Sequence, residues 1–215
     1  AHIRKAGVNI EHSVALDNKK TSYYYAVLDR NGELHIALAD MEIYNHIPLY
    51  PFTHTWQTWM DDSLVFIDAN LPTMVVERAI QVASEKKLKI CIDPVSAPKA
   101  KALPPHLQHV YLIKPDLLEA TAMTGIPIHS INDCLRAGKA LHERGIENVI
   151  ISLGKSGYVI VNAETEEYVE TMIFSEIVDA TGAGDAFIAG ILLGLQQNLP
   201  IREACQMGAA AAAFT

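Results

Sequence analysis

Apolar residues in this sequence fall into short uninterrupted runs, and the segment between the first two runs has helical spacing. The runs typical of buried strands lie at 64–67, 88–92, 110–113 and 148–153. Between 72 and 86 the apolar positions recur at the spacing of one helix face, and Pro72 suits the first turn of that helix. Strand, helix and strand in this order predict parallel pairing through a right-handed crossover.

The pattern then predicts two further helices and an antiparallel pair of strands. A helix at 117–124 is closed by Gly125, and a second at 130–144 begins with a capping pattern at Ser130 and Asp133. The two antiparallel strands are predicted at 158–162 and 168–172, around a turn-like segment at 163–166. Parallel strands that alternate with helices place the chain in the α/β class.

Before the first buried strand, two runs rich in Tyr, Val, Ile and Leu predict a β-hairpin. The runs lie at 21–29 and 33–39 and are separated by Arg30-Asn31-Gly32, whose Asn-Gly pair is a strong hairpin signal. The tyrosines at 23–25 can stack on a base, although packing is the commoner role of tyrosine in a hairpin. Asp40, just past the hairpin, is a candidate to bind a substrate, and its alternative is a solvated loop acid.

Composition narrows the class of partner. A chain of 215 residues, half of them hydrophobic, can bury one core, so we expect a single domain over 1–215. A net charge of −8 argues against nucleic acid or an anionic membrane and favours a small polar metabolite. Cys91, Cys134 and Cys205 form no Cys-x-x-Cys pair and read as reduced thiols, which indicates a cytoplasmic protein. We expect no membrane span, because no apolar run is long enough.

The strongest chemical motif is a glycine-rich turn that opens an apolar run. Gly182 and Gly184 flank Ala183, Asp185 follows, and a helix-like run continues through 188–195. Glycines before a helix let the backbone approach a ligand, and the free amides at the helix N-terminus favour an anion. Asp185 then falls in the first helical turn, where the helix dipole keeps its carboxylate ionised and able to accept a proton.

Competing interpretations of this motif fit it less well. Its structural alternative is a left-handed turn before a core helix. A Walker A loop fails because Gly154-Lys155-Ser156 has Val149 where the earlier glycine is required. A dinucleotide fingerprint fails because Phe187 occupies the third glycine position. Amides that hold a phosphoryl group beside a carboxylate base suit phosphate transfer to a hydroxyl.

Four stretches of the sequence resemble a known family of kinases. The stretch at 179–185 resembles the C-terminal signature of the ribokinase-like (PfkB) carbohydrate and nucleoside kinases. Three further stretches resemble the pseudouridine kinases, a subgroup of that family: 28–33 leading to Asp40-Met41, 93–97 with Lys99, and 114–120. The resemblance implies a ribokinase-like three-layer α/β fold, with a mostly parallel sheet flanked by helices. It also implies a hairpin lid at about 20–42 that closes over the sugar and pairs with its twin in a homodimer.

The resemblance also implies ATP and Mg²⁺ as cofactors. Asp116 and Glu119 match the family's Asn-x-x-Glu motif, which orients Mg²⁺ waters and ATP phosphates, although Asp here replaces the neutral Asn. The alternative for this pair is an ordinary acidic first turn of a helix. Ser152, Gly154 and Gly157 resemble the family's nucleotide loop, and a plain turn at the end of a strand would also explain these glycines.

The resemblance also implies a monovalent cation such as K⁺, because Asp179 and Thr181 lie where the family often binds one, although Ala180 replaces a frequent threonine.

In parallel α/β sheets, ligands bind at the carboxyl ends of the strands. This rule places Asp68, Asp93, Lys114, Gly154 and the loop at Gly182 along one edge. No role for Asp93 or for Lys99 follows from the sequence.

The two ends of the sequence predict a piece of a longer kinase. The chain begins in what reads as the end of a helix before Gly7 and stops in an alanine-rich helix at 208–215. A naturally short, degenerate member is the alternative. The expected activity is ATP-dependent phosphorylation of a primary hydroxyl, and the resemblance points to the 5′-hydroxyl of pseudouridine. A ribokinase, another nucleoside kinase of the family, or a non-catalytic ligand-binding relative are the alternatives.

Overall fold

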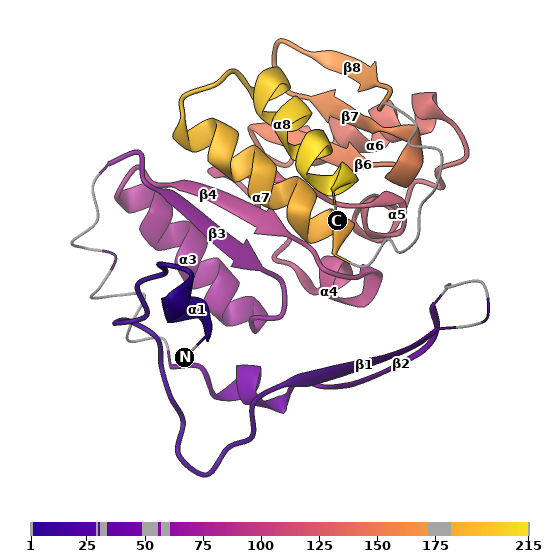
Figure 1. Ribbon diagram of the computed structural model, residues 1–215. Helices are drawn as coiled ribbons and strands as arrows, with labels where there is room; N and C mark the ends of the chain where they lie inside the picture. The colour runs from indigo at the N-terminus through magenta and orange to yellow at the C-terminus, as the bar shows by residue number, and fades with distance from the viewer. Residues whose placement is uncertain are drawn as a thin grey trace.

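The computed structural model describes residues 2–28, 30, 34–48, 56, 61–171 and 182–214. Within these ranges one sheet has six strands in the order β3-β4-β5-β6-β7-β8, and a separate sheet pairs β1 with β2 (Figure 1). The strands of the larger sheet are β3 (Leu64–Asp68), β4 (Lys89–Asp93), β5 (Val110–Ile113), β6 (Asn148–Ser152), β7 (Tyr158–Val161) and β8 (Glu166–Val169). Strands β3 to β6 are parallel, whereas β7 and β8 are antiparallel additions.

Helices cover both faces of this sheet, and each face has its own core. The helices are α3 (Thr73–Glu85), α4 (Ala97–Ala102), α5 (Leu117–Thr124), α6 (Ile131–His142), α7 (Ala183–Gln196) and α8 (Ile201–Ala213). Along β4, Ile90 and Ile92 pack in one core with residues of α3 and α6, while Cys91 packs in the other with residues of α7 and α8. Because both faces of β4 to β7 are covered, these central strands are nearly continuous buried runs, whereas Phe66 of β3 is exposed and β8 alternates between exposed and partly buried positions. The three-layer α/β fold predicted from the sequence is therefore confirmed.

Helices α7 and α8 pack against each other at glycine positions (Figure 1). A Cβ atom added to Gly190 would lie 2.6 Å from the Cα of Gly208, and one added to Gly194 would lie 2.7 Å from the Cα of Ala204. Only glycine allows backbones to approach so closely. This contact fixes α7, and with it the turn at Gly182, over the sheet. The alanine-rich segment is helical, as its pattern predicted.

Two elements differ from the predictions. Strand β8 begins at Glu166, whereas a strand was predicted at 168–172. The turn is shorter because the Oδ1 of Asn162 accepts hydrogen bonds from the amides of Glu164 and Thr165 at 2.9 and 2.8 Å. Helix α4 was not predicted, since six residues are too short to show a periodic pattern.

The N-terminal elements confirm the predicted hairpin. A short helix α1 (His2–Lys5) precedes β1 (Tyr23–Leu28) and β2 (Leu34–Asp40), which pair in antiparallel fashion, and a short 3-10 helix η1 (Glu42–His46) follows. The Asn-Gly of the predicted turn lies outside the described residues. The hairpin extends away from the layered body (Figure 1). None of the helices in the described ranges is long and apolar enough to cross a membrane.

Candidate active site

The glycine-rich motif forms the N-terminus of α7. Gly182 is the N-cap and has a left-handed φ of +85°, which glycine adopts without strain. The first helical hydrogen bond runs from the Ala186 amide to the Gly182 carbonyl at 2.8 Å, so the amides of Ala183, Gly184 and Asp185 have no acceptor within the helix. The side chain of Asp185 is exposed beside them. Among the described residues, this turn therefore combines amides that have no acceptor within the helix with an exposed carboxylate.

A buried ion pair lies next to this turn. The Nζ of Lys114, at the end of β5, is 3.1 Å from the Oδ2 of Asp93, at the end of β4. The two residues are 4% and 7% exposed. A Cβ added to Gly184 would lie 3.7 Å from the same Nζ, so the ammonium contacts the first turn of α7. The predicted carboxyl edge of the sheet and the glycine motif thus come together here.

Asp116 and Glu119 form a reciprocal cap on α5. The Glu119 amide donates to the Asp116 Oδ1 at 2.8 Å, and the Asp116 amide donates to the Glu119 Oε2 at 2.9 Å. The pair thus lies at a helix start, as the alternative of an acidic first turn predicted, and in addition it caps the helix. Capping does not require burial, yet Glu119 is only 5% exposed. Burial, together with the charges of Asp116 and Asp93, raises the pKa of Glu119 to about 7 despite the Asp116 amide and Lys114.

The carboxylates of Asp116 and Glu119 suit Mg²⁺ only when the phosphates of a bound nucleotide supply further oxygen ligands. In the described part of the chain no group of three or more His, Cys, Asp and Glu side chains could hold a metal ion. Mg²⁺ commonly binds one or two carboxylates together with substrate phosphates and water. Each carboxylate of the Asp116–Glu119 pair uses one oxygen in the cap, and the other accepts no hydrogen bond from the described part of the chain. The donor set therefore fits Mg²⁺ that arrives with a nucleotide.

The predicted nucleotide loop adjoins this cap. The Ser152 amide donates to the Pro115 carbonyl at 2.9 Å, and Ser152 pairs with Asp116 in an isolated β-bridge. The loop continues as a short 3-10 helix η3 (Gly154–Ser156). Gly154 has a φ of +57° and no atom within 4 Å of an added Cβ, so its backbone faces open space. Gly157 differs, because its φ of +106° favours glycine and an added Cβ would clash with the carbonyl oxygen of Val169, so local structure explains this glycine without a ligand.

The loop after β4 is held in an unusual conformation. The Asp93 Oδ1 accepts a hydrogen bond from the Val95 amide at 3.0 Å, and the Ser96 amide bonds to the Pro94 carbonyl at 2.8 Å. Val95 has a φ of +68°, which is rare for a β-branched residue. Lys99 donates to the side chain of Asn70, at the end of β3. Sequence reasoning gave no role to this loop, because the strain becomes visible only in the backbone.

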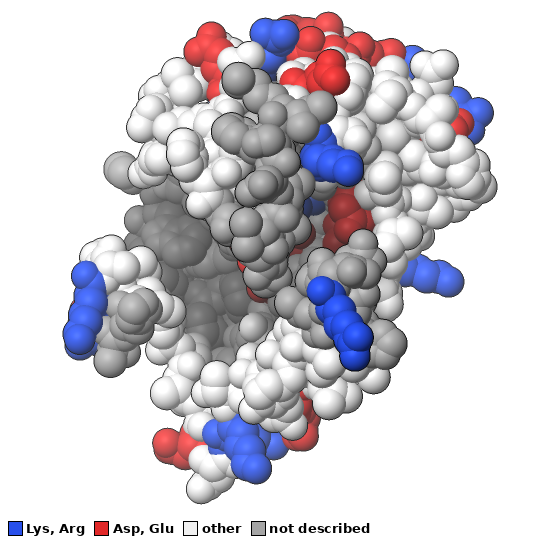
Figure 2. Space-filling model, turned by 45° about the vertical axis from the view of Figure 1, so that its right-hand side comes forward, with Lys and Arg blue, Asp and Glu red and all other residues white. Residues whose placement is uncertain are grey.

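The remaining predicted residues lie at the ends of β2 and β3 or outside the described ranges. Asp40 ends β2, where its Oδ1 accepts a hydrogen bond from the Glu42 amide at 3.0 Å. Asp68 ends β3 and pairs in register with Asp93. Asp179 and Thr181 lie outside the described residues. The face in Figure 2 shows acidic side chains set back in a hollow.

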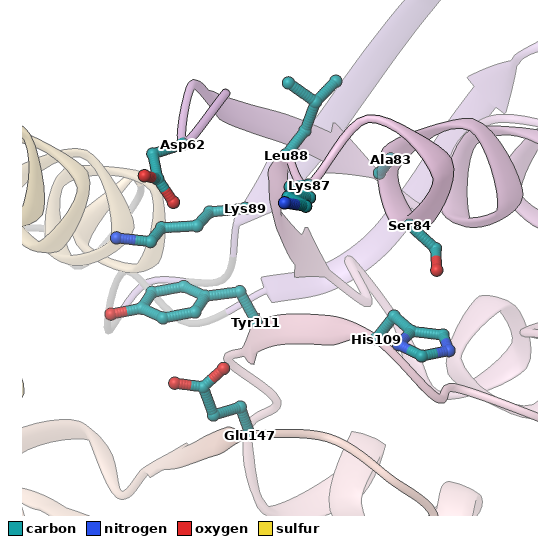
Figure 3. Close-up of a pocket in the computed structure, with 9 residues that line it drawn as sticks. All are labelled: Asp62, Ala83, Ser84, Lys87, Leu88, Lys89, His109, Tyr111 and Glu147. Atoms are coloured by element: carbon teal, nitrogen blue, oxygen red, sulfur yellow. The ribbon is translucent and has the colours of Figure 1, made fainter. Parts of the chain in front are cut away.

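A separate pocket of about 460 Å³ opens at the other edge of the sheet (Figure 3). Lys89, at the start of β4, places its ammonium 5.3 Å from the ring centre of Tyr111. Asp62 and Glu147 lie on either side of that pair (Figure 3). None of the predicted site residues lines this pocket. The candidate active site is therefore the cluster at the carboxyl edge and not this pocket.

Comparison with known proteins identifies the family of the chain. The profile of the "pfkB family carbohydrate kinase" family matches residues 1–215. The chain is 25% identical to the pseudouridine kinase of Escherichia coli over 93% of its own length and 63% of that enzyme's. It is also 25% identical to the ribokinase of Haemophilus influenzae, over 97% of its own length and 67% of that enzyme's.

A solved structure shows the same fold. The carbohydrate kinase from Agrobacterium tumefaciens superposes with a TM-score of 0.74 at 28% identity, over 92% of this chain and 62% of that one. The chain thus spans about two thirds or less of the length of the proteins it matches.

Proposed function

We propose a function for this chain from one premise: it belongs to the pfkB family of carbohydrate kinases. The proposed reaction transfers the γ-phosphoryl group of ATP to a primary hydroxyl of a nucleoside or sugar, with the 5′-hydroxyl of pseudouridine as the favoured acceptor. The observation that carries the proposal is the first turn of α7, where amides without an acceptor in the helix and the exposed Asp185 carboxylate lie next to the Lys114 ammonium. The whole chain acts in this proposal as a single domain with a hairpin lid.

Asp185 serves as general base in the proposed mechanism. Its carboxylate takes the proton of the acceptor hydroxyl while that oxygen forms a bond to the γ-phosphorus. The bond between this phosphorus and the bridging oxygen of ADP breaks, and the electron pair leaves with ADP. The amides of Gly182, Ala183 and Gly184 stabilise the charge on the transferring oxygens. One such donor is typically worth about 3 kcal/mol of barrier.

Asp116 and Glu119 are the residues that would hold Mg²⁺ through their free oxygens. When bound, Mg²⁺ neutralises phosphate charge. The backbone at Ser152 and Gly154 would lie along the nucleotide, because the β-bridge joins this loop to Asp116. Gly157 shapes the same loop. A monovalent cation such as K⁺ at Asp179 and Thr181 belongs to the proposal by resemblance alone.

The acceptor is proposed from resemblance. Pseudouridine kinase and ribokinase match the chain at the same 25% identity, so similarity favours neither. The stretches at 28–33, 93–97 and 114–120 favour pseudouridine, with Asp40 as a candidate contact to the acceptor. The partner is therefore a small molecule and not nucleic acid or a membrane. Three buried thiols without a disulfide agree with a cytoplasmic location.

A panel of acceptors tests this proposal. We expect the protein expressed from its complete gene to release ADP from ATP and Mg²⁺ with saturation by pseudouridine, and at least tenfold less efficiently with uridine or ribose. Saturation by ribose instead would support the proposed kinase activity but would show that ribose, and not pseudouridine, is the acceptor. Binding of a nucleoside without ADP release from folded protein would favour the non-catalytic relative.

The hairpin is proposed to join two copies of the chain. Tyr25 pairs with Leu38 and Val27 with Ile36, so these apolar side chains share one face, and they are 46% to 62% exposed. A two-stranded sheet is marginal alone and gains from covering such a face. We expect sedimentation velocity to give a dimer that Leu38→Lys converts to monomer, while Lys20→Glu, outside the strands, leaves the dimer intact. A wild-type monomer at micromolar concentration would contradict this assembly.

A further inference from the structure

The proposed reaction steps assign no role to the side chain of Lys114. Its ammonium lies at the carboxyl end of β5, 4% exposed, and the Lys114 amide is fixed by a 3.1 Å hydrogen bond to the Ile92 carbonyl of β4. Among the described residues its one ion-pair partner is Asp93, at 3.1 Å. An ammonium has three donor hydrogens, so this ion pair leaves donors for another acceptor.

The direction of that free side is given by Gly184. Cβ atoms in a helix tilt toward its N-terminus, and the Lys114 Nζ lies 3.7 Å from the Cβ position of Gly184. The ammonium therefore lies against the first turn of α7, whose amides at 183–185 have no acceptor within the helix. A charged donor and the helix amides converge on the same space.

The ion pair is poorly explained by stability. A buried ion pair contributes little net stability, because desolvation offsets the attraction between the two charges. The partner carboxylate is held independently, since its second oxygen accepts the Val95 amide at 3.0 Å. Asp93 thus forms a rigid support for the ammonium. Such a support holds a charge in place for a ligand.

We propose that Lys114 binds the transferring phosphoryl group, with its ammonium held by Asp93 and directed past Gly184 beside the amides of residues 182–184. This proposal rests on the proposed function. Lys114 keeps its proton throughout, and it contributes positive charge that opposes the negative charge on the transferring oxygens. The proton of the acceptor still goes to Asp185, and the leaving group is still ADP.

Two variants separate this role from a structural one. Lys114→Met removes the ammonium but leaves Asp93 buried without a counter-charge, so it risks misfolding. The double variant Lys114→Met with Asp93→Asn removes both charges and keeps an oxygen for the Val95 amide. Lys101→Met, at an exposed lysine of α4, is the matched control.

We expect the double variant to fold and to lose at least a hundredfold in kcat. Its affinity for the β,γ-imido analogue of ATP should fall about tenfold, with ADP affinity within threefold of wild type, because only the analogue carries a γ-phosphate. Recovery of wild-type kcat in the double variant, or equal loss of affinity for ADP and the analogue, overturns the role of Lys114. A wild-type protein without turnover contradicts the proposed function instead, and the comparison of analogue with ADP then decides on Lys114.

Discussion

Asp185→Asn is expected to lower kcat about a thousandfold, with the KM for ATP within threefold of wild type. Asparagine keeps the size of the side chain but cannot take a proton from the acceptor hydroxyl. The carboxylate lies in the first turn of α7 and is exposed, so its replacement leaves the core intact. Initial rates of ADP release at saturating ATP measure the effect.

Glu203→Gln provides a matched control for Asp185→Asn. Glu203 is likewise an exposed acid in the first turn of its helix, α8, at the same distance from the helix start. Both substitutions lose a favourable interaction with a helix dipole, about 0.5 kcal/mol of stability each. Only Asp185→Asn should affect turnover. Similar rates for the two variants would show that Asp185 is simply an acid at a helix start.

Glu119→Gln is expected to stabilise the protein at pH 8 while it lowers activity. The pKa of Glu119 is raised to about 7, so the folded protein keeps a proton that the unfolded chain, with an ordinary glutamate pKa of 4.5, releases. Stability therefore falls as pH rises from about 4.5 to 7, and the full cost of ionising the buried carboxyl is present above pH 7. Glutamine keeps an oxygen for the Asp116 amide and has no charge to desolvate.

Urea denaturation of the Mg²⁺-free protein at pH 5 and pH 8 tests this expectation. The variant should exceed the wild type in free energy of unfolding by less than about 1 kcal/mol at pH 5 and by up to about 3 kcal/mol at pH 8. Activity should fall roughly tenfold to a hundredfold, as for other residues that orient metal ligands. Equal stability of variant and wild type at pH 8 would contradict the raised pKa.

Asp133→Asn should change stability in the opposite direction and serves as control. Asp133 also lies in the first turn of a helix, α6, but it is less buried than Glu119, and hydrogen bonds from the Ser130 hydroxyl and the His129 amide hold its pKa below the usual value. A carboxyl group whose pKa is lowered by folding stabilises the folded protein at pH values above the pKa it has in the unfolded chain. Loss of the Asp133 carboxylate should therefore destabilise the protein at pH 8. Asp133 is then an acid that stabilises the protein, and Glu119 is an acid whose burial destabilises it. An acid of the second kind is typical of functional sites.

Sequence patterns predicted most of the fold because both faces of the sheet are covered. Uninterrupted apolar runs located β3 to β7 to within about one residue, and Gly125 marked the end of α5 by its left-handed φ of +72°. Strand β8 was misplaced because its start depends on the side chain of Asn162, and α4 was too short to show a period. Local hydrogen bonds decide such boundaries, and hydrophobic pattern does not record them.

The candidate site was predictable only in part. The motif at 182–185 identified the start of α7 because glycine and an acid at a helix start have a local physical meaning. The association of Lys114 with Asp93 depends on the register of β4 and β5, which shifts between Ile90 and Cys91. The packing role of Gly157 depends on the approach of Val169 from another strand. Contacts between distant segments of the chain therefore could not be predicted from the sequence pattern.

The central claim is that this site forms a phosphomonoester on an acceptor hydroxyl, and the phosphorus NMR spectrum of the reaction tests it most directly. With ATP, Mg²⁺ and pseudouridine, we predict one new phosphomonoester resonance, coupled to the 5′-methylene protons and growing in step with ADP. The Asp185→Asn protein should give that resonance about a thousandfold more slowly. Inorganic phosphate as the only new product, or an unchanged ATP spectrum with every acceptor tested, would contradict the account.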